Sequence, residues 1–255
     1  MRIPYIFDIQ RSSTVDGPGL RSVVFFKGCN LDCFWCHNPE GKSPLPQGAC
    51  FSEKCTHCGV CRSVCQNALC TLCGDCTRYC PEQARKIYGR IYGEDELLDI
   101  LLKDLPYYSA TGGGVTFSGG ECMLYPEFLA SMARKCRDAG ISIAVDTAGC
   151  VPYEHFLPLL PLVDLFLYDI KCLDADLHKK GTGVDNAQIL KNLDRLQKSG
   201  ARILVRTPII PDFNDGEEQK RIAELCRERG LPWEALPYHR FGESKRAAWS
   251  APFKK

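Results

Sequence analysis

Cysteine is the residue that most constrains this sequence, because 17 of its 255 residues are cysteines. Eleven of the 17 stand in three runs with short, regular spacings. A chain of this length can bury a sizeable hydrophobic core without disulfides, and reducing compartments do not favour disulfide formation. Regularly spaced thiols in such a chain therefore indicate ligation of a metal or an iron–sulfur cluster.

Two of the runs follow one another, and each has the spacing CxxCxxCxxxC. In the doubled bacterial ferredoxin arrangement, the fourth cysteine of each run binds the cluster of the other run. The sequence therefore predicts one 4Fe–4S cluster held by Cys55, Cys58, Cys61 and Cys80. It predicts a second cluster held by Cys65, Cys70, Cys73 and Cys76. The alternative is a pair of zinc sites, for which His57 is available.

The third run differs in kind, because Cys29, Cys33 and Cys36 supply three thiolates and not four. A cubane held by three cysteines leaves one iron without a protein ligand. An open metal position is typical of catalytic sites, whereas structural sites are closed. Such an iron could chelate the amino and carboxylate groups of a methionine-like ligand.

Apolar runs rich in β-branched residues predict six strands, and helical patterns separate most of them. The predicted strands span residues 20–26, 115–117, 141–145, 163–170, 202–206 and 233–236. The predicted helices span residues 94–104, 126–138, 186–198 and 217–229. The alternation of strands and helices indicates an α/β fold with a parallel sheet.

Polar clusters follow the predicted strands, which is where ligands bind in parallel α/β folds. In chain order these clusters are CNLDCFWCHN, SGGE, Asp146 with Thr147, Asp169 with Lys171, TPIIPDFND, and Tyr238 with His239. We therefore expect the chemistry to lie along one edge of the sheet. By contrast, Cys136 and Cys226 fall on apolar helix faces and are expected to fill the core, while Cys50, Cys150 and Cys172 have no assignment.

The segment 42–89 interrupts the alternation with prolines and cysteines, so it is interpreted as an insert within a domain formed by residues 1–41 and 90–255. Gly59 and Gly74 follow the second cysteine of each ferredoxin run, where close backbone approach to sulfur would suit glycine. The net charge of +1 favours neither nucleic acid nor a membrane. The amino terminus has no secretion-signal pattern and the most apolar stretch, 157–168, is too short to span a bilayer, so a cytoplasmic location is expected.

The motif CNLDCFWC resembles the CxxxCxxC signature of the radical S-adenosylmethionine superfamily. Further motifs across the chain resemble the glycyl-radical-enzyme activating enzymes, a family related to the pyruvate formate-lyase activating enzyme. They are VDGPGLR at 15–21, CHNPE at 36–40, TFSGGE at 116–121, DIK at 169–171, TGVDN at 182–186 and LPYHRFG at 236–242. One departure is Cys122, which stands where the family usually has proline after SGGE.

The resemblance implies a partial (β/α)6 TIM-like barrel with an inserted ferredoxin-like two-cluster module. It implies one catalytic and two auxiliary 4Fe–4S clusters, and S-adenosylmethionine as the cofactor that is reductively cleaved to methionine and a 5′-deoxyadenosyl radical. That radical takes a hydrogen atom from the Cα of a glycine in a partner glycyl radical enzyme. The expected partner is a dehydratase, a decarboxylase, or a carbon–nitrogen or carbon–sulfur lyase.

The resemblance also implies roles for individual residues. The catalytic set is Cys29, Cys33, Cys36 and Lys171. The expected cofactor-binding residues include Trp35. They also include Gly119, Gly120 and Glu121 for the amino group, Asp169, Lys171 and His239 for the carboxylate and ribose, and Asp146 and Thr147 near the sulfonium, with a monovalent cation beside them. The expected residues for the partner's glycine loop are Asp16, Gly17 and Gly19.

The insert is expected to accept electrons from a ferredoxin or flavodoxin and pass them to the catalytic cluster. The protein is expected to be a monomer. A structural or docking role for the insert is the alternative. Three other functions stay open at this point. They are a radical S-adenosylmethionine enzyme acting on a small metabolite or peptide, an iron–sulfur electron carrier, and a zinc-dependent nucleic-acid binder.

Overall fold

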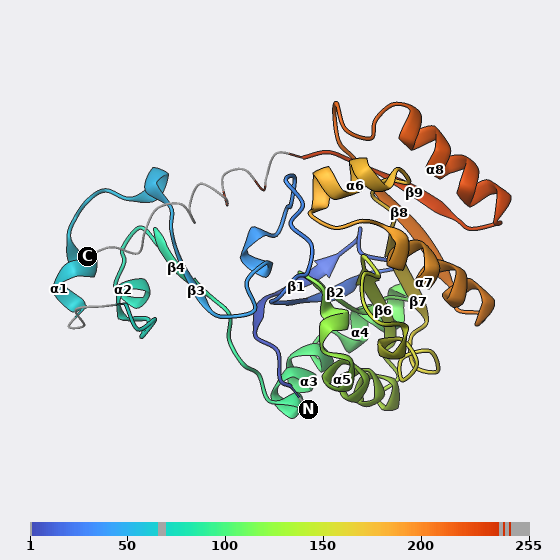
Figure 1. The fold of residues 1–255 in the computed structure, drawn as a ribbon. Coiled ribbons are helices and arrows are strands. Elements are labelled where there is room, and N and C mark those ends of the chain that lie inside the picture. The colour runs from blue at the N-terminus through green and yellow to red at the C-terminus, as the bar shows by residue number, and fades with distance from the viewer. Residues whose placement is uncertain (1, 66–69, 240–241, 243–244, 246–255) are drawn as a thin grey trace.

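The computed structural model describes residues 2–65, 70–239, 242 and 245 (Figure 1). The carboxyl-terminal end of the predicted barrel domain, 246–255, therefore lies outside the described residues. So does Gln66, which follows the first ferredoxin-like cysteine run at the position where proline is usual. One seven-stranded sheet dominates the structure, in the order β1-β2-β5-β6-β7-β8-β9. Its strands are β1 (Ile6–Ser13), β2 (Arg21–Phe26), β5 (Gly114–Gly119), β6 (Ser142–Thr147), β7 (Leu165–Asp169), β8 (Ile203–Ile209) and β9 (Trp233–Pro237).

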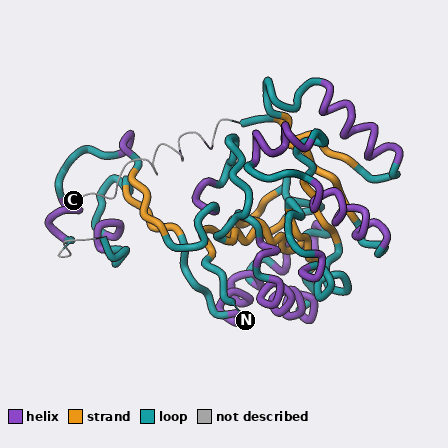
Figure 2. The backbone as a smooth tube through the Cα atoms, in the orientation of Figure 1, coloured by secondary structure: helices purple, strands orange, loops and turns teal. Residues whose placement is uncertain are grey.

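The six strands from β2 to β9 in this sheet pair in parallel, which confirms the predicted α/β fold. β1 was not predicted, and it pairs antiparallel with β2. Because β1 and β9 are not paired with each other, the curved sheet is a partial barrel and not a closed one. Figures 1 and 2 show the helices around the outside of this sheet.

Five helices of the barrel pack their apolar faces on the sheet. They are α3 (Glu94–Leu102), α4 (Leu105–Thr111), α5 (Pro126–Asp138), α7 (Ala187–Lys198) and α8 (Glu217–Glu228). A further helix, α6 (Ala175–Thr182), contributes no residue to this core. The core between helices and sheet buries side chains such as Phe117, Leu129 and Leu193 completely. Cys136 and Cys226 lie in the same core, which confirms that they are filling residues.

Two helix predictions need correction. The predicted helix 94–104 ends earlier, because α3 stops at Leu102 and a second helix begins with Pro106 in its first turn. Proline is tolerated there because its missing N–H needs no helical partner. The short helix α6 was missed. It begins where the side chain of Asp174 accepts a hydrogen bond from the backbone N–H of Leu177 at 2.8 Å.

The insert segment forms a separate small unit. β3 (Gln47–Cys50) and β4 (Arg85–Tyr88) pair antiparallel, and α1 (Val60–Val64) and α2 (Asp75–Arg78) lie beyond them, away from the barrel in Figure 1. Gly59 and Gly74 precede these helices with φ of +78° and +91°. A left-handed backbone therefore accounts for both glycines, in a place where an added Cβ would meet little.

Short 3₁₀ helices complete the described structure, at η1 (Pro39–Gly41), η2 (Ser52–Lys54), η3 (Cys122–Leu124) and η4 (Tyr153–His155). Among the described residues, every helix is too short or too polar to cross a membrane.

Candidate functional site

A cavity of about 200 Å³ lies at the carboxyl ends of the parallel strands, and we call it the main cavity. Each parallel strand, or the loop that follows it, contributes to its lining. Ten residues predicted from the sequence line it: Cys29, Cys33, Trp35, Cys36, Gly119, Gly120, Asp146, Thr147, Asp169 and Lys171. The topology of the sheet therefore brings most of the predicted site to one place.

The cysteine loop after β2 is held by backbone hydrogen bonds from distant segments. The N–H of Asp32 donates to the carbonyl of Thr182 at 2.7 Å, and the N–H of Phe34 donates to that of Gly181 at 3.1 Å. A Cβ at Gly181 would lie 2.8 Å or less from the rings of Trp35 and Phe213. The end of α6 therefore needs glycine so that the cysteine loop can pack against it.

The ring of Trp35 packs in an apolar cluster and so holds the cysteine loop in place. Its side chain is 4% exposed, and its ring packs on that of Phe213 with centroids 4.7 Å apart. Leu31 and Ile210 belong to the same small apolar cluster. These side chains form an apolar wall beside the three thiols.

The three thiols are set in surroundings of low polarity. Burial raises the pKa of Cys29 to about 12 and that of Cys33 to about 11, and it also raises the pKa of Cys36. Because thiols bind metals as thiolates, assembly of a cluster here must release their protons. In the described part of the chain no three His, Cys, Asp or Glu side chains are arranged to hold a single metal ion. Three thiols around one cavity suit a cubane, which binds each thiolate through a different iron atom.

The SGGE segment is confined by its neighbours. Gly119 has φ of +120°, and a Cβ at Gly120 would lie 2.3 Å from the carbonyl oxygen of Gly28 and 2.5 Å from that of Gly41. The two glycines therefore bring the end of β5 against the cysteine loop, leaving only backbone between them at the cavity wall.

Glu121 lies behind this wall and does not line the main cavity. It is 1% exposed, and its carboxylate accepts hydrogen bonds from Thr147 Oγ1 at 2.7 Å and from the backbone N–H groups of Met123 at 3.1 Å and Ala148 at 3.0 Å. Burial raises the pKa of Glu121 to about 7, against the effect of these donors. In this structure the side chain fixes the loop after β6, and its contact with a cofactor amino group stays a prediction.

An ion pair and a buried carboxylate form the polar side of the main cavity. Lys171 Nζ lies 2.7 Å from Asp169 Oδ2, and Ser118 Oγ donates to Asp146 Oδ2 at 2.7 Å. Burial lowers the pKa of Lys171, but the charges of Asp169 and Cys33 outweigh burial and raise it. Burial raises the pKa of Asp146 to about 6, although Arg206 opposes the shift.

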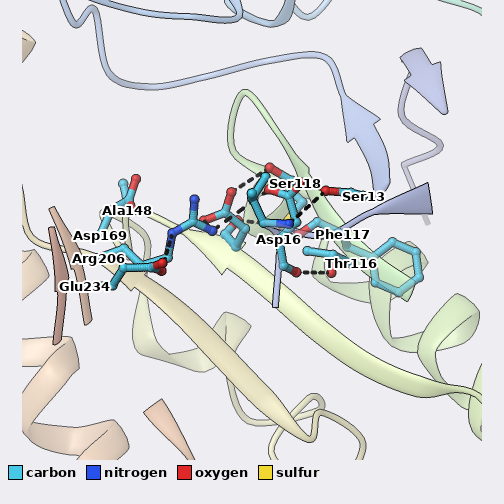
Figure 3. Close-up of polar contacts among 12 residues, drawn as sticks. Ser13, Asp16, Thr116, Phe117, Ser118, Ala148, Asp169, Arg206 and Glu234 are labelled. Atoms are coloured by element: carbon cyan, nitrogen blue, oxygen red, sulfur yellow. Dashed lines mark hydrogen bonds and ion pairs between the residues drawn. The ribbon is translucent and has the colours of Figure 1, made fainter. Parts of the chain in front are cut away.

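Arg206 is the main site residue that was not predicted. Its side chain lies 3.9 Å from Asp146 and 4.0 Å from both Asp16 and Glu234. Figure 3 shows it among Asp16, Asp169 and Glu234. It is 8% exposed, and its Nε and Nη1 atoms have no hydrogen-bond partner within the described structure. The sequence did contain a signal, since Arg206 ends the predicted strand 202–206, at the edge where polar residues were expected.

The loop between β1 and β2 contributes Asp16 to the acidic residues around Arg206. Ser13 Oγ donates to Asp16 Oδ2 at 2.5 Å, and Thr116 Oγ1 donates to the Asp16 carbonyl at 2.7 Å. Gly17 and Gly19 have φ of +116° and +70°. A Cβ at Gly19 would meet the backbone N of Gly113 at 2.4 Å, so glycine at this position lets the loop between β1 and β2 pack closely against the backbone just before β5. A role of the loop in receiving a partner stays a prediction.

Two other predicted features lie away from the main cavity. His239 is exposed and is not among the lining residues, although its ring lies 6.5 Å from that of His37, which lines the cavity. Cys122 is fully buried, and its thiol donates to the carbonyl of Phe117 at 3.4 Å. The departure from proline after SGGE is therefore accommodated in the core and does not place a thiol in the cavity.

A second cavity, of about 220 Å³, lies in the insert segment, and we call it the insert cavity. It is lined by Cys55, Cys58, Cys61 and Cys80, with His57 among its other residues. The structure thus gathers the four thiols that were expected to hold one auxiliary cluster. In the other expected ligand set, the thiol of Cys76 lies close enough to those of Cys65 and Cys70 for their charges to interact.

Comparisons with known proteins agree with this geometry. The radical SAM superfamily matches residues 23–226. The chain is 39% identical to the isethionate sulfite-lyase activating enzyme of Nitratidesulfovibrio vulgaris, over 94% of this chain and 85% of that protein. It is 38% identical to the trans-4-hydroxy-L-proline dehydratase activating enzyme of Clostridioides difficile, over 95% of this chain and 86% of that protein. The structure of Streptococcus suis SuiB with its precursor peptide SuiA shares the fold, with a TM-score of 0.54 and 12% identity over 83% of this chain and 37% of that one.

The protein is a radical SAM enzyme, the class that the partial barrel and the three-cysteine loop define. S-adenosylmethionine and one 4Fe–4S cluster are the cofactors of that class. Within it, the chain belongs to the activating enzymes of glycyl radical enzymes.

Proposed function

We propose that this enzyme cleaves S-adenosylmethionine reductively in the main cavity and uses the product to take a hydrogen atom from a glycine of a partner enzyme. One observation carries the proposal: three thiols, a glycine-lined wall and the Asp169–Lys171 ion pair share one cavity at the carboxyl ends of the parallel strands. When bound at Cys29, Cys33 and Cys36, a 4Fe–4S cluster would supply the electron that cleaves the cofactor.

The chain's own residues bind and orient the cofactor. The backbone of Gly119 and Gly120, which lines the cavity, and the open iron would hold the methionine end of the cofactor. Lys171 offers a buried positive charge to the carboxylate, while Asp169 holds the Lys171 ammonium in place and also suits ribose hydroxyls. The apolar wall formed by Leu31, Trp35 and Ile210 excludes water from the thiol side, which protects a reactive radical.

The partner's glycine would enter over the loop that carries Asp16 and Gly17. Arg206 supports this interpretation, because it lies 4.0 Å from Asp16 and 3.9 Å from Asp146 and so links the entry loop to the cavity. Asp146 and Thr147 would hold a monovalent cation beside the cofactor. His239 would complete the ribose or carboxylate contacts, which needs its exposed ring to turn toward the cavity.

The insert segment would carry two auxiliary clusters and admit electrons from a ferredoxin or flavodoxin. The gathering of Cys55, Cys58, Cys61 and Cys80 around the insert cavity supports the first of them. A reducing cytoplasm suits a chain with so many free thiols. The relatives activate a sulfite-lyase and a dehydratase, so the proposed partner is a glycyl radical enzyme of the lyase or dehydratase class.

The test uses this protein, reconstituted with iron and sulfide without oxygen and mixed in turn with glycyl radical enzymes of the lyase and dehydratase classes. The expected results are 5′-deoxyadenosine by mass spectrometry and a glycyl radical doublet by electron paramagnetic resonance. The Cys29→Ala, Cys33→Ala, Cys36→Ala variant should give neither, while the matched thiol variant Cys136→Ala should give both. Formation of 5′-deoxyadenosine without any radical on the partner would favour action on a small metabolite or peptide instead.

A further inference from the structure

One cation lies between the two sets of cysteines in the insert segment. Arg85 is the first residue of β4, and in the antiparallel pair it stands opposite Cys50, the last residue of β3. Its side chain is half-buried and lines the insert cavity together with Cys61 and Cys80. The strand pair therefore fixes the backbone of Arg85 at the edge of the first set.

The same guanidinium reaches the second set. Arg85 donates a hydrogen bond to the thiol of Cys76, which lies in α2 and is 7% exposed. Cys76 in turn lies within electrostatic range of Cys65 and Cys70. Arg85 is therefore a neighbour of Cys61 in one expected ligand set and a donor to Cys76 in the other.

This side chain is charged at every pH at which the protein folds, because a guanidinium does not lose its proton in that range. A guanidinium also carries five N–H donors in a rigid fork, so one side chain can serve two neighbours at once. Arg62 also lines the insert cavity, but it is exposed and solvent screens its charge.

We propose that Arg85 is a positioning residue that raises the reduction potentials of both auxiliary clusters and links them electrostatically. Hydrogen bonds to the sulfur ligands and nearby positive charge stabilise the reduced, more negative state of an iron–sulfur cluster. An electron received from a protein donor would then be retained at either cluster until it passes to the three-cysteine site. Arg85 itself is neither oxidised nor reduced. This inference rests on the proposed two-cluster function of the insert.

The test is a potentiometric titration of the full-length reconstituted enzyme, followed by electron paramagnetic resonance, with iron counted in every sample. The spectrum of the variant that lacks Cys29, Cys33 and Cys36 identifies the signals of the insert. In Arg85→Gln, the reduced-to-oxidised ratio of the Cys76 cluster at the wild-type midpoint should fall about tenfold, equal to 59 mV for a one-electron couple. The ratio of the Cys61 cluster should fall in the same direction.

Two variants make the result specific. Arg62→Gln removes an exposed guanidinium from the same cavity and should leave the potential of the Cys76 cluster unchanged. Arg85→Lys keeps the positive charge but removes the forked set of N–H donors, so it should lower the potential of the Cys76 cluster by less than Arg85→Gln does. If Arg85→Gln takes up no cluster, Arg85→Lys provides the comparison.

Two outcomes would overturn the proposal in different ways. Wild-type potentials in both Arg85 variants, with a full iron content, would refute the role of Arg85 and leave the function of the insert standing. An iron content in the wild-type chain that matches one cluster would refute the two-cluster insert itself, and this inference with it.

Discussion

At the scale of single residues, the site is built by groups that hold the loops in place from behind the cavity. Glu121 is the clearest case, because its buried carboxylate accepts three hydrogen bonds from residues of two loops. The resemblance to the activating enzymes implies that Glu121 contacts the amino group of the cofactor. Its burial shows that a residue of such a motif can also support a site by holding neighbouring loops in place.

The pKa of Glu121 gives the first prediction. A carboxyl whose pKa is raised to about 7 in the folded state contributes stability at low pH, and that contribution is lost as the pH rises through 7. Glu121→Gln has no such dependence, although it loses one acceptor at every pH. The stability of the wild type relative to Glu121→Gln should therefore fall by about 2 kcal/mol between pH 5.5 and 8, as measured by urea denaturation. A difference that stays constant, or that grows with pH, would contradict the assigned environment.

Gly120 gives the second prediction. A methyl group there would lie 2.3 Å from the carbonyl oxygen of Gly28, a backbone atom that cannot move aside without displacing the cysteine loop. Gly120→Ala should destabilise the protein by about 3 kcal/mol in urea and should lower its iron content after reconstitution. Gly93→Ala is the control, since an added Cβ meets nothing within 4 Å at that position. Equal behaviour of the two variants would show that the SGGE segment adapts.

At the scale of elements, the strands and helices that could be predicted are those whose burial leaves a clear hydrophobic pattern in the sequence. The strands β2, β5, β6 and β7 are largely buried and show as apolar runs in the sequence, so they were found. β8 and the more exposed β9 were found from their apolar residues. β3 and β4 were missed because each has four residues, and α6 was missed because it is short and contains Gly181. Arg206 was not predicted as a site residue because a single arginine at the end of a strand belongs to no motif. Only its neighbours in the folded structure identify it as part of the site.

The joint between the insert and the barrel gives the third prediction. Lys27 directly follows β2 and is fully buried, and its ammonium donates to the carbonyl of Glu40 and, at 3.2 Å, to Gln47 Oε1. A Cβ at Gly89 would lie 2.8 Å from the Lys27 side chain, so Lys27 contacts both connections of the insert. Lys27→Met should loosen the first connection and speed tryptic cleavage after Lys42 about fivefold, the effect of losing roughly 1 kcal/mol of hydrogen bonding.

Cleavage after Lys198, at the end of α7, provides the internal control for that experiment. Its rate should be the same in the wild type and in Lys27→Met, because Lys198 is remote in the fold from the joint. If both sites are cut faster, the variant is globally unstable. If neither changes, the buried ammonium does not anchor the connection.

At the scale of the whole molecule, the barrel and the insert share little packing. The small apolar cluster that joins them consists of Phe7, Ala49 and Tyr88, with Phe25 and Phe51 beside it. None of the described residues between 47 and 88 belongs to the main core. Since Gln47 pairs directly with Tyr88, the two ends of the insert lie side by side and a short linker can join them.

This arrangement leads to the last prediction. A chain in which residues 47–88 are replaced by a short Gly-Ser linker should fold, and its iron content should drop from roughly twelve to roughly four atoms per chain. With a strong chemical reductant it should still cleave S-adenosylmethionine at a rate close to that of the full chain. With reduced ferredoxin or flavodoxin as the only donor, the rate should fall at least tenfold, because the protein donor would lose its point of entry. Unchanged rates with both reductants would assign the insert a structural or docking role, whereas equal losses with both would show that the barrel depends on the insert for its fold.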